Sequence, residues 1–234
     1  MALPKLKIPE YELVVPSTQE KIKYRPFLVK EEKVLLLAME SEDDRQINDA
    51  LVNTVSECTF GSVDGRSAPV FDMEYVFLQV RSKSVGESVE LNITCPDDGK
   101  RRVGVKGELS EVAVQMRVED KSEFEVREDI KLVMGYPTLY SSQKVDGDSD
   151  TETVFKLMQG CISEIHFGDD VYRKVDISKK ELDEFFGSLT SEMLAKVQEF
   201  FETMPKLRHI IDVKNPKTKK KNEVMLEGLG DFFT

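Results

Sequence analysis

Cys95 stands in the stretch Thr94–Lys100, whose letters TCPDDGK resemble one half of a zinc knuckle. A knuckle has the form Cys-Pro-x-Cys-Gly, so that two thiolates bind one metal ion. Asp98 stands where the second cysteine would be. A closed structural zinc site takes four cysteine or histidine ligands, and the whole chain has three cysteines and two histidines. We therefore favour a hairpin turn with a buried Cys95, and we expect neither a metal nor a cofactor.

The usual catalytic patterns are absent from the sequence. It has no G-x-S-x-G, G-x-G-x-x-G or G-x-x-x-x-G-K-[ST] segment, which are the signatures of a serine nucleophile and of phosphate-binding loops. Cys58 and Cys161 each lie on the apolar face of a predicted helix, where a free cysteine usually behaves as a small buried hydrophobic residue. His166 and His209 lack the paired spacing of metal ligands. We predict a protein without enzymatic activity.

The charge balance argues against nucleic acid as a partner. The chain has 33 Lys plus Arg against 44 Asp plus Glu, a net charge of -11, whereas binding to a phosphate backbone depends on basic residues. The basic cluster KTKKK (Lys217–Lys221) has no interleaved aromatic residues and is typical of a solvated turn. A docking patch for an acidic protein or for nucleic acid is the alternative for this cluster.

The cysteine usage and the N-terminus indicate the compartment. Three widely spaced cysteines suggest no disulfide framework. The opening MALPKLKIPEYELVV carries proline and charge where a signal peptide has an apolar run. The longest apolar run, Val34–Met39, is far shorter than the ~20 residues of a membrane-spanning helix. We expect folding in a reducing cytoplasm and no membrane partner.

The first part of the chain predicts hairpins and helices. Alternating apolar and polar residues predict a hairpin from Tyr11–Val15 and Lys21–Phe27. Helical spacing predicts three helices, at 29–43, 44–58 and 71–86. The apolar face of the first helix consists of Val34, Leu35, Leu37 and Ala38. A second hairpin follows, with TCPDDGK at its tip.

The last part of the chain is predicted to be mostly helical. Apolar residues at helical spacing predict a helix over Thr151–Phe167. Ser178 and Glu181 have the spacing of a capping box at the start of a second helix. A third helix ends before Pro205, and a strand–turn–strand completes the chain.

The sequence therefore predicts an α+β fold, with helices packed against short antiparallel β-hairpins. The polar, acidic segment Ser141–Asp150 is the best linker in the chain. We expect an N-terminal α+β lobe at 1–140, the linker at 141–150, and a C-terminal helical lobe at 151–234 that ends in a β-hairpin.

The hairpin around Cys95 and the strand–turn–strand at the end of the chain align without a gap at an offset of 120 residues. The aligned pairs are Cys95/Asn215, Pro96/Pro216, Asp98/Thr218, Lys100/Lys220, Val105/Met225 and Leu109/Leu229. One interpretation is chance similarity between two proline-containing hairpins. The other is a degenerate pair of knuckle turns held by hydrogen bonds instead of metal, because Asp, Asn and Thr cap turns through their own side-chain oxygens.

Aromatic residues near the linker and the C-terminus are candidates for partner contact. An aromatic pair at a terminus that ordinarily frays must either fold back on the core or anchor in a partner, and we favour folding back. The candidate contact residues are Tyr136, Leu139, Tyr140, Phe232 and Phe233.

Long segments of distinctive sequence run through the chain. They are YRPFLVKEEKVLLLAMES (Tyr24–Ser41), FDMEYVFLQVRSKSVGE (Phe71–Glu87), VELNITCPDDGK (Val89–Lys100) and the C-terminal NPKT…LEGLGDFF. Together they resemble the baseplate hub proteins of T4-like contractile-tailed bacteriophages. The resemblance is densest over residues 24–96 and weakest between about 110 and 150.

This resemblance implies a role in building the central hub of the tail baseplate, and it offers no catalytic residue to carry over. The leading hypothesis is a structural component that contacts other tail or baseplate hub proteins, made in the host cytoplasm and located in the virion tail baseplate. One alternative is a transient assembly chaperone for a hub or tape-measure protein, absent from the mature virion. A third hypothesis, from a different class, is a small zinc-dependent nucleic-acid-binding module.

Overall fold

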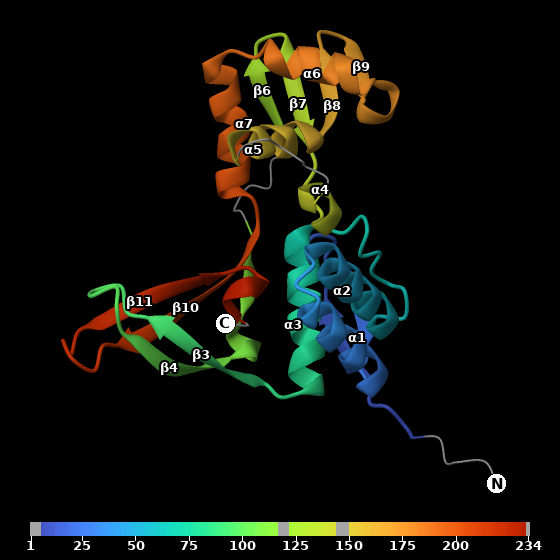
Figure 1. The fold of residues 1–234 in the computed structure, drawn as a ribbon. Coiled ribbons are helices and arrows are strands. Elements are labelled where there is room, and N and C mark those ends of the chain that lie inside the picture. The colour runs from blue at the N-terminus through green and yellow to red at the C-terminus, as the bar shows by residue number, and fades with distance from the viewer. Residues whose placement is uncertain (1–5, 117–121, 144–149, 233–234) are drawn as a thin grey trace. The chain divides into compact units, whose positions relative to one another are not determined.

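The computed structural model describes residues 6–116, 122–143 and 150–232 of the chain (Figure 1). These residues form seven α-helices and eleven strands in small antiparallel sheets, which confirms the predicted α+β class. The chain divides into two compact units. Met1–Gln115 and Lys206–Thr234 make the larger unit, and Met116–Pro205 makes the smaller one.

The larger unit contains three antiparallel hairpins. Its strands are β1 (Tyr11–Val14), β2 (Lys21–Tyr24), β3 (Ser88–Thr94), β4 (Arg102–Glu108), β5 (Ala113–Gln115), β10 (Lys206–Lys214) and β11 (Lys221–Glu227). β1 pairs with β2, β3 with β4, and β10 with β11, while the short β5 adds to the free edge of β10. All three hairpins follow the alternation predicted from the sequence.

Three helices complete this unit, as predicted: α1 (Val29–Glu40), α2 (Asp44–Cys58) and α3 (Val70–Ser84). Helix α2 packs between α1 and α3. Asp43 caps the N-terminus of α2, where its carboxylate accepts the N–H of Arg45 at 2.8 Å. Helix α3 also packs against the hairpins β3–β4 and β10–β11, which lie side by side (Figure 1).

A hydrophobic core joins α3 to these two hairpins. Its buried residues are Leu78, Leu91, Ile93, Cys95, Leu109, Val112, Leu207, Ile211, Val213, Leu226 and Phe232. The strand residues among them alternate with exposed ones, because successive side chains of a strand point to opposite faces of the sheet.

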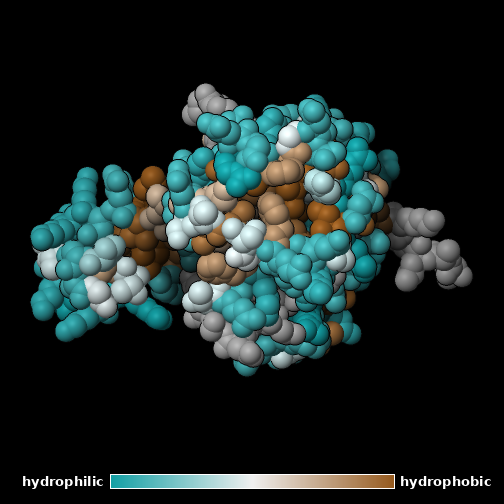
Figure 2. All heavy atoms as spheres, turned by 90° about the horizontal axis from the view of Figure 1, so that it is seen from above, coloured by the Kyte–Doolittle hydropathy of each residue, from teal (hydrophilic) through white to brown (hydrophobic). Residues whose placement is uncertain are grey.

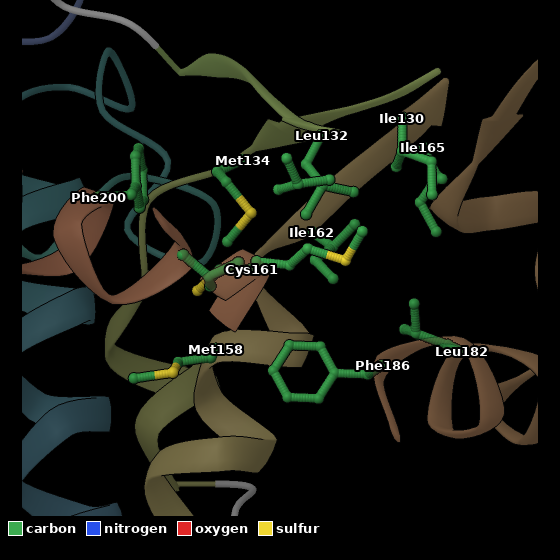
Figure 3. Packing of buried hydrophobic residues seen from close by; sticks show 13 residues of the cluster. Ile130, Leu132, Met134, Met158, Cys161, Ile162, Ile165, Leu182, Phe186 and Phe200 are labelled. Atoms are coloured by element: carbon green, nitrogen blue, oxygen red, sulfur yellow. The ribbon is translucent and has the colours of Figure 1, made fainter. Parts of the chain in front are cut away.

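The smaller unit is one four-stranded antiparallel sheet with helices on it. The sheet order is β6 (Glu123–Arg127), β7 (Ile130–Met134), β8 (Ile162–Phe167) and β9 (Asp170–Arg173). The helices are α4 (Leu139–Gln143), α5 (Asp150–Gly160), α6 (Lys179–Gly187) and α7 (Ser191–Thr203). Figure 3 shows apolar side chains of β7 and β8 facing those of α5, α6 and α7 across the core of this unit.

One predicted helix is too long. The sequence predicted a helix over Thr151–Phe167, but α5 ends at Gly160 and β8 begins at Ile162. Glycine favours the end of a helix, and Ile162–Phe167 pairs along its length with β7 and β9 in the middle of the sheet. The apolar pattern of Ile162–Phe167 is compatible with a helix or with a strand, and pairing with the neighbouring strands decides for the strand.

The capping box at Ser178 is confirmed. The Ser178 N–H donates to the Glu181 carboxylate at 2.9 Å, and the Glu181 N–H donates to Ser178 Oγ at 3.3 Å. Both lobe boundaries predicted around the linker 141–150 fall inside the smaller unit, and residues 144–149 lie outside the described residues. The division into lobes at 1–140 and 151–234 stays a prediction.

Candidate functional site

The tip of the hairpin β3–β4 is the turn that the sequence compared with a zinc knuckle. The Cys95 N–H donates to the Arg101 carbonyl at 2.8 Å, and the Gly99 N–H donates to the Cys95 carbonyl at 2.9 Å. Asp98 Oδ1 accepts the N–H groups of Lys100 at 3.0 Å and of Arg101 at 3.1 Å. Asp98 therefore stabilises the turn as a hydrogen-bond acceptor for the backbone, a role that a thiolate fills poorly.

Cys95 itself is fully buried in the core of the larger unit. Burial raises the pKa of its thiol, and the nearby carboxylates of Asp97 and Asp98 raise it further. Across residues 6–116, 122–143 and 150–232, no group of three or more His, Cys, Asp or Glu is placed to hold a metal ion. In this environment Cys95 behaves as a small apolar side chain.

Asp97, the neighbour of Asp98, connects this tip to the tip of the hairpin β10–β11. Its carboxylate accepts a hydrogen bond from Asn215 Nδ2 at 2.8 Å, another from Asn222 Nδ2 at 3.3 Å, and a third from Thr218 Oγ1. These donors, Thr218 foremost, lower the pKa of the Asp97 carboxyl. We name this set the Asp97 clasp: Asp97 together with Asn215, Thr218 and Asn222.

The second tip begins with the same backbone as the first but is one residue shorter, since Lys214 pairs with Lys221 whereas Thr94 pairs with Arg102. The Asn215 N–H donates to the Lys220 carbonyl at 3.0 Å, and the Lys219 N–H donates to the Asn215 carbonyl at 2.9 Å. Gly99 and Lys219 have the same φ of 62°. The buried Asn215 accepts the N–H groups of Lys217 at 2.9 Å and of Thr218 at 3.3 Å through Oδ1. Hydrogen bonds therefore hold two similar turns of different length. The offset of 120 residues relates the first strands (Leu91 and Ile211), but the second strands correspond at an offset of 119 (Val105 and Val224), so the alignment without a gap was wrong there.

The repeat extends beyond the turns. The aligned residues that are buried in both copies are Leu91 with Ile211, Ile93 with Val213, Cys95 with Asn215, and Val112 with Phe232. A 3₁₀ helix follows each hairpin, Leu109–Glu111 after the first and Leu229–Phe232 after the second. Matching burial at matching positions favours a structural repeat over chance similarity.

The tip of β1–β2 is a third version of the turn. The Val15 N–H donates to the Glu20 carbonyl at 2.9 Å, the Gln19 N–H donates to the Val15 carbonyl at 2.8 Å, and Gln19 has a φ of 58°. Its residue Ser17, at the position of Asp97, donates its N–H to the buried Asp72 of α3 at 3.0 Å and its hydroxyl to the same carboxylate. The shared signal is a proline second and a threonine or aspartate fourth in the turn.

The two 3₁₀ helices share one attachment, and the second has another in addition. The Leu109 N–H donates to the backbone carbonyl of Glu87 at 2.8 Å, and the Gly228 N–H donates in the same way to the carbonyl of Leu207 at 3.0 Å. The Leu229 N–H also donates to the Glu74 carboxylate at 3.0 Å. Burial raises the pKa of Glu74 to about 7, although the hydrogen bond from Leu229 opposes that shift. One attachment of the C-terminal 3₁₀ helix therefore depends on a titratable group.

The other cysteines are buried and protonated at neutral pH. Burial raises the pKa of the Cys58 thiol to about 11 and that of the Cys161 thiol to about 11. A thiolate, not a thiol, is the nucleophile and the metal ligand. Their environments match the expectation of small buried hydrophobes.

The predicted contact residues lie in different surroundings. Tyr136 is half-buried and stacks on Phe200, with 5.6 Å between the ring centroids. Leu139 and Tyr140 are half-buried in α4. Phe232 is 2% exposed and lies in the core of the larger unit, and Phe233 lies outside the described residues. Their role as partner contacts stays a prediction.

An apolar cavity that the sequence did not indicate opens at one end of the smaller unit. It has a volume of about 480 Å³ and lies between the sheet and α6. Its apolar lining consists of Ile130, Ile165, Phe167, Tyr172, Ile177 and Phe185, and polar residues such as Arg127 and Glu181 border it. Figure 2 looks onto this end and shows apolar residues gathered within a hydrophilic rim. Cavities of this kind accept apolar groups of a ligand or partner.

Exposed apolar side chains of this kind are typical of proteins that work by contact with partners. In this chain the polar cluster is satisfied by internal hydrogen bonds, the thiols are buried, and apolar side chains remain exposed on the surface. None of the helices in the described ranges is long and apolar enough to span a membrane.

The family match agrees with this class. A family model described as T4 bacteriophage base plate protein matches residues 8–234. The chain belongs to this family, and it is a T4-like phage baseplate protein, as its sequence resemblance implied. Searches of curated proteins and of solved structures gave no significant match.

Proposed function

We propose that the protein is a non-enzymatic structural component of the baseplate central hub, which it helps to assemble through contacts with other tail proteins. The family match over residues 8–234 carries this proposal. The apolar cavity of the smaller unit supports it, because apolar side chains of a partner are the chemistry that such a cavity accepts.

Assembly in the host cytoplasm and retention in the virion tail belong to the same proposal. Mass spectrometry of purified virions, together with isolated baseplate intermediates, tests it. We expect peptides of this protein in the mature particle at a fixed ratio to other hub proteins. Absence from the virion combined with presence in intermediates would reject the structural role in favour of an assembly chaperone.

The cavity is tested separately with a phage that carries Tyr172→Asp. Tyr172 lines the cavity and is 47% exposed, so a carboxylate there places charge against a partner without emptying the core. We expect fewer complete baseplates and at least a tenfold lower plating efficiency. The matched control is Val175→Asp, an exposed apolar residue outside the cavity lining. Equal behaviour of the two variants would remove the cavity from the proposal.

A further inference from the structure

Helix α1 has an unusual distribution of apolar residues. Its residues Val29, Val34, Leu36, Leu37 and Met39 are exposed, with fractions from 48% at Val34 to 80% at Val29. A surface helix normally turns its apolar stripe toward the core and its charges toward solvent. Helix α1 therefore exposes several large apolar side chains that nothing in the described chain covers, interspersed with charged ones.

The opposite face of α1 explains why this orientation is fixed. Its buried residues are Ala38 and Glu31. Glu31 accepts the Leu28 N–H at 2.8 Å and pairs with the buried Arg25 at 2.9 Å. A buried ion pair holds its geometry because separation leaves an uncompensated charge. The helix cannot rotate its leucines inward without breaking this pair, so they stay at the surface.

The charges on the exposed face are ordered along the helix. Lys33 precedes Leu36 and Leu37, and Glu40 follows them, on the same side because seven residues span two turns. Neither Lys33 nor Glu40 forms an ion pair within the part of the chain that the structure describes. Glu40 also lies in the last turn, where the helix dipole disfavours a carboxylate.

We propose that two copies of this chain pair through α1, with the helices antiparallel around a two-fold axis between Leu36 and Leu37. In this register Leu36 lies opposite the partner's Leu37, and Lys33 lies opposite the partner's Glu40. A two-fold interface must be self-complementary. The order of basic, apolar and acidic residues along α1 meets this condition when the two helices are antiparallel. A parallel pairing would place Lys33 against the partner's Lys33, so charge selects the antiparallel form.

Further apolar surface continues from the N-terminal end of α1. A groove of about 1100 Å³ lies there, and its apolar lining includes Leu6, Ile8, Phe27, Leu28, Val29 and Val85. Helix α1 alone is roughly 18 Å long, which is short for a stable interface of ~800 Å² per partner. The groove enlarges the apolar area, and we expect a dimer with a dissociation constant on the order of micromolar.

Sedimentation velocity of the purified full-length chain tests the pairing. We expect a shift from monomer to dimer as the protein concentration rises through ~1–100 µM. Leu36→Asp should leave a monomer over this range, since it puts two carboxylates at the axis. The matched control Val175→Asp adds the same charge to an exposed position of the smaller unit and should dimerise like the parent. A parent chain that stays monomeric throughout overturns the proposal.

A charge exchange tests the register. Lys33→Glu and Glu40→Lys should each weaken the dimer about tenfold, because each single change creates two like-charge contacts. The double variant restores opposite charges and should recover most of the affinity. Glu184→Lys, an exposed helical charge reversal in α6, is the control. Single variants without effect, or a double variant no better than either, would overturn the register. The result is independent of whether the protein belongs to the hub.

Discussion

The tips of the hairpins β3–β4 and β10–β11 begin with the same backbone, differ in length by one residue, and differ in what they bury. At the same turn position, the first buries Cys95 among apolar residues, and the second buries Asn215 within the Asp97 clasp. Both hairpins are bonded to a backbone carbonyl where they lead into a 3₁₀ helix, and the second 3₁₀ helix also donates to the Glu74 carboxylate. One supersecondary unit thus exists in an apolar version and in a polar version that responds to pH.

This comparison explains why the turn at Thr94–Lys100 resembles one half of a zinc knuckle. A turn of this geometry needs acceptors for its N–H groups, and Asp98 provides them in one copy while Asn215 provides them in the other. Hydrogen bonds from side chains to the backbone therefore hold both turns. The predictions below test the polar copy against the apolar one.

The largest expected effect is at Glu74. Its pKa of about 7 in the fold lies above its usual value of 4.5, so the folded protein keeps a proton that the unfolded chain releases. Stability is therefore highest below pH 4.5 for this group and falls as pH rises toward 7, by up to about 3 kcal/mol. Glu74→Gln stays neutral and can still accept the Leu229 N–H, so it should remove this loss.

Urea unfolding at several pH values measures this, followed by circular dichroism because the chain has no tryptophan. The informative quantity is the stability of Glu74→Gln minus that of the parent chain. We expect it to grow in favour of the variant between pH 5 and 7.5. Glu87→Gln is the control at the attachment of the apolar copy, since there the backbone carbonyl, not the side chain, accepts the Leu109 N–H. A difference that stays flat with pH would show that Glu74 remains ionised.

Asn215 should come next. Asn215→Leu keeps the volume but removes the acceptor for the N–H groups of Lys217 and Thr218, and it removes a donor to Asp97. These three part-buried hydrogen bonds contribute about 0.5–1.5 kcal/mol each, so the variant should lose about 2–3 kcal/mol in the free energy of unfolding. Cys95→Ala at the equivalent position breaks no side-chain hydrogen bond and should cost less. If Cys95→Ala were the more damaging change, packing and not polarity would dominate both tips.

Asp97→Ala should have a smaller effect, a decrease of a few degrees in the melting temperature. The sign of its pH dependence is opposite to that of Glu74. Hydrogen bonds from Thr218 and Asn215 lower the pKa of Asp97, so its stabilisation is present above the usual aspartate value of 3.8 and is lost as pH falls below it. The exposed Asp212→Ala on β10 is the control. Equal melting temperatures for both variants would remove the clasp as a stabilising feature.

The sequence predicted the parts of this unit that depend on local residues. Alternation, prolines and turn residues located all three hairpins, and the offset of 120 residues matched the first strands of the repeat while missing the shift of one residue in the second strands. It did not predict the Asp97 clasp, because Asp97 and Asn215 are 118 residues apart and nothing local marks the contact. The bond between Glu74 and Leu229, 155 residues apart, was missed for the same reason.

Two other misses have a different physical origin. The helix predicted to reach Phe167 ends at Gly160, because Ile162–Phe167 forms a strand that pairs with β7 and β9. The apolar residues of α1 were read as one face, yet only Ala38 among them is fully buried. Periodicity shows that apolar residues share a side, but it does not say whether that side meets the core or a partner. The cavity of the smaller unit forms only where the sheet packs against α6, so the sequence did not indicate it either.

The smallest expected effect compares the two tips directly. Gly99 and Lys219 both have a φ of 62°, a left-handed conformation that costs a residue with a Cβ about 1 kcal/mol and costs glycine little. Lys219→Gly should therefore stabilise the protein by about 0.5–1 kcal/mol, and Gly99→Lys should destabilise it by a similar amount. No heavy atom lies within 4 Å of a Cβ built on Gly99, so strain and not a clash decides the result. The double exchange should be close to neutral in urea unfolding. Any marked departure from neutrality would mean that the extra residue of the first tip, or the clasp at the second, strains or relaxes the backbone at this position.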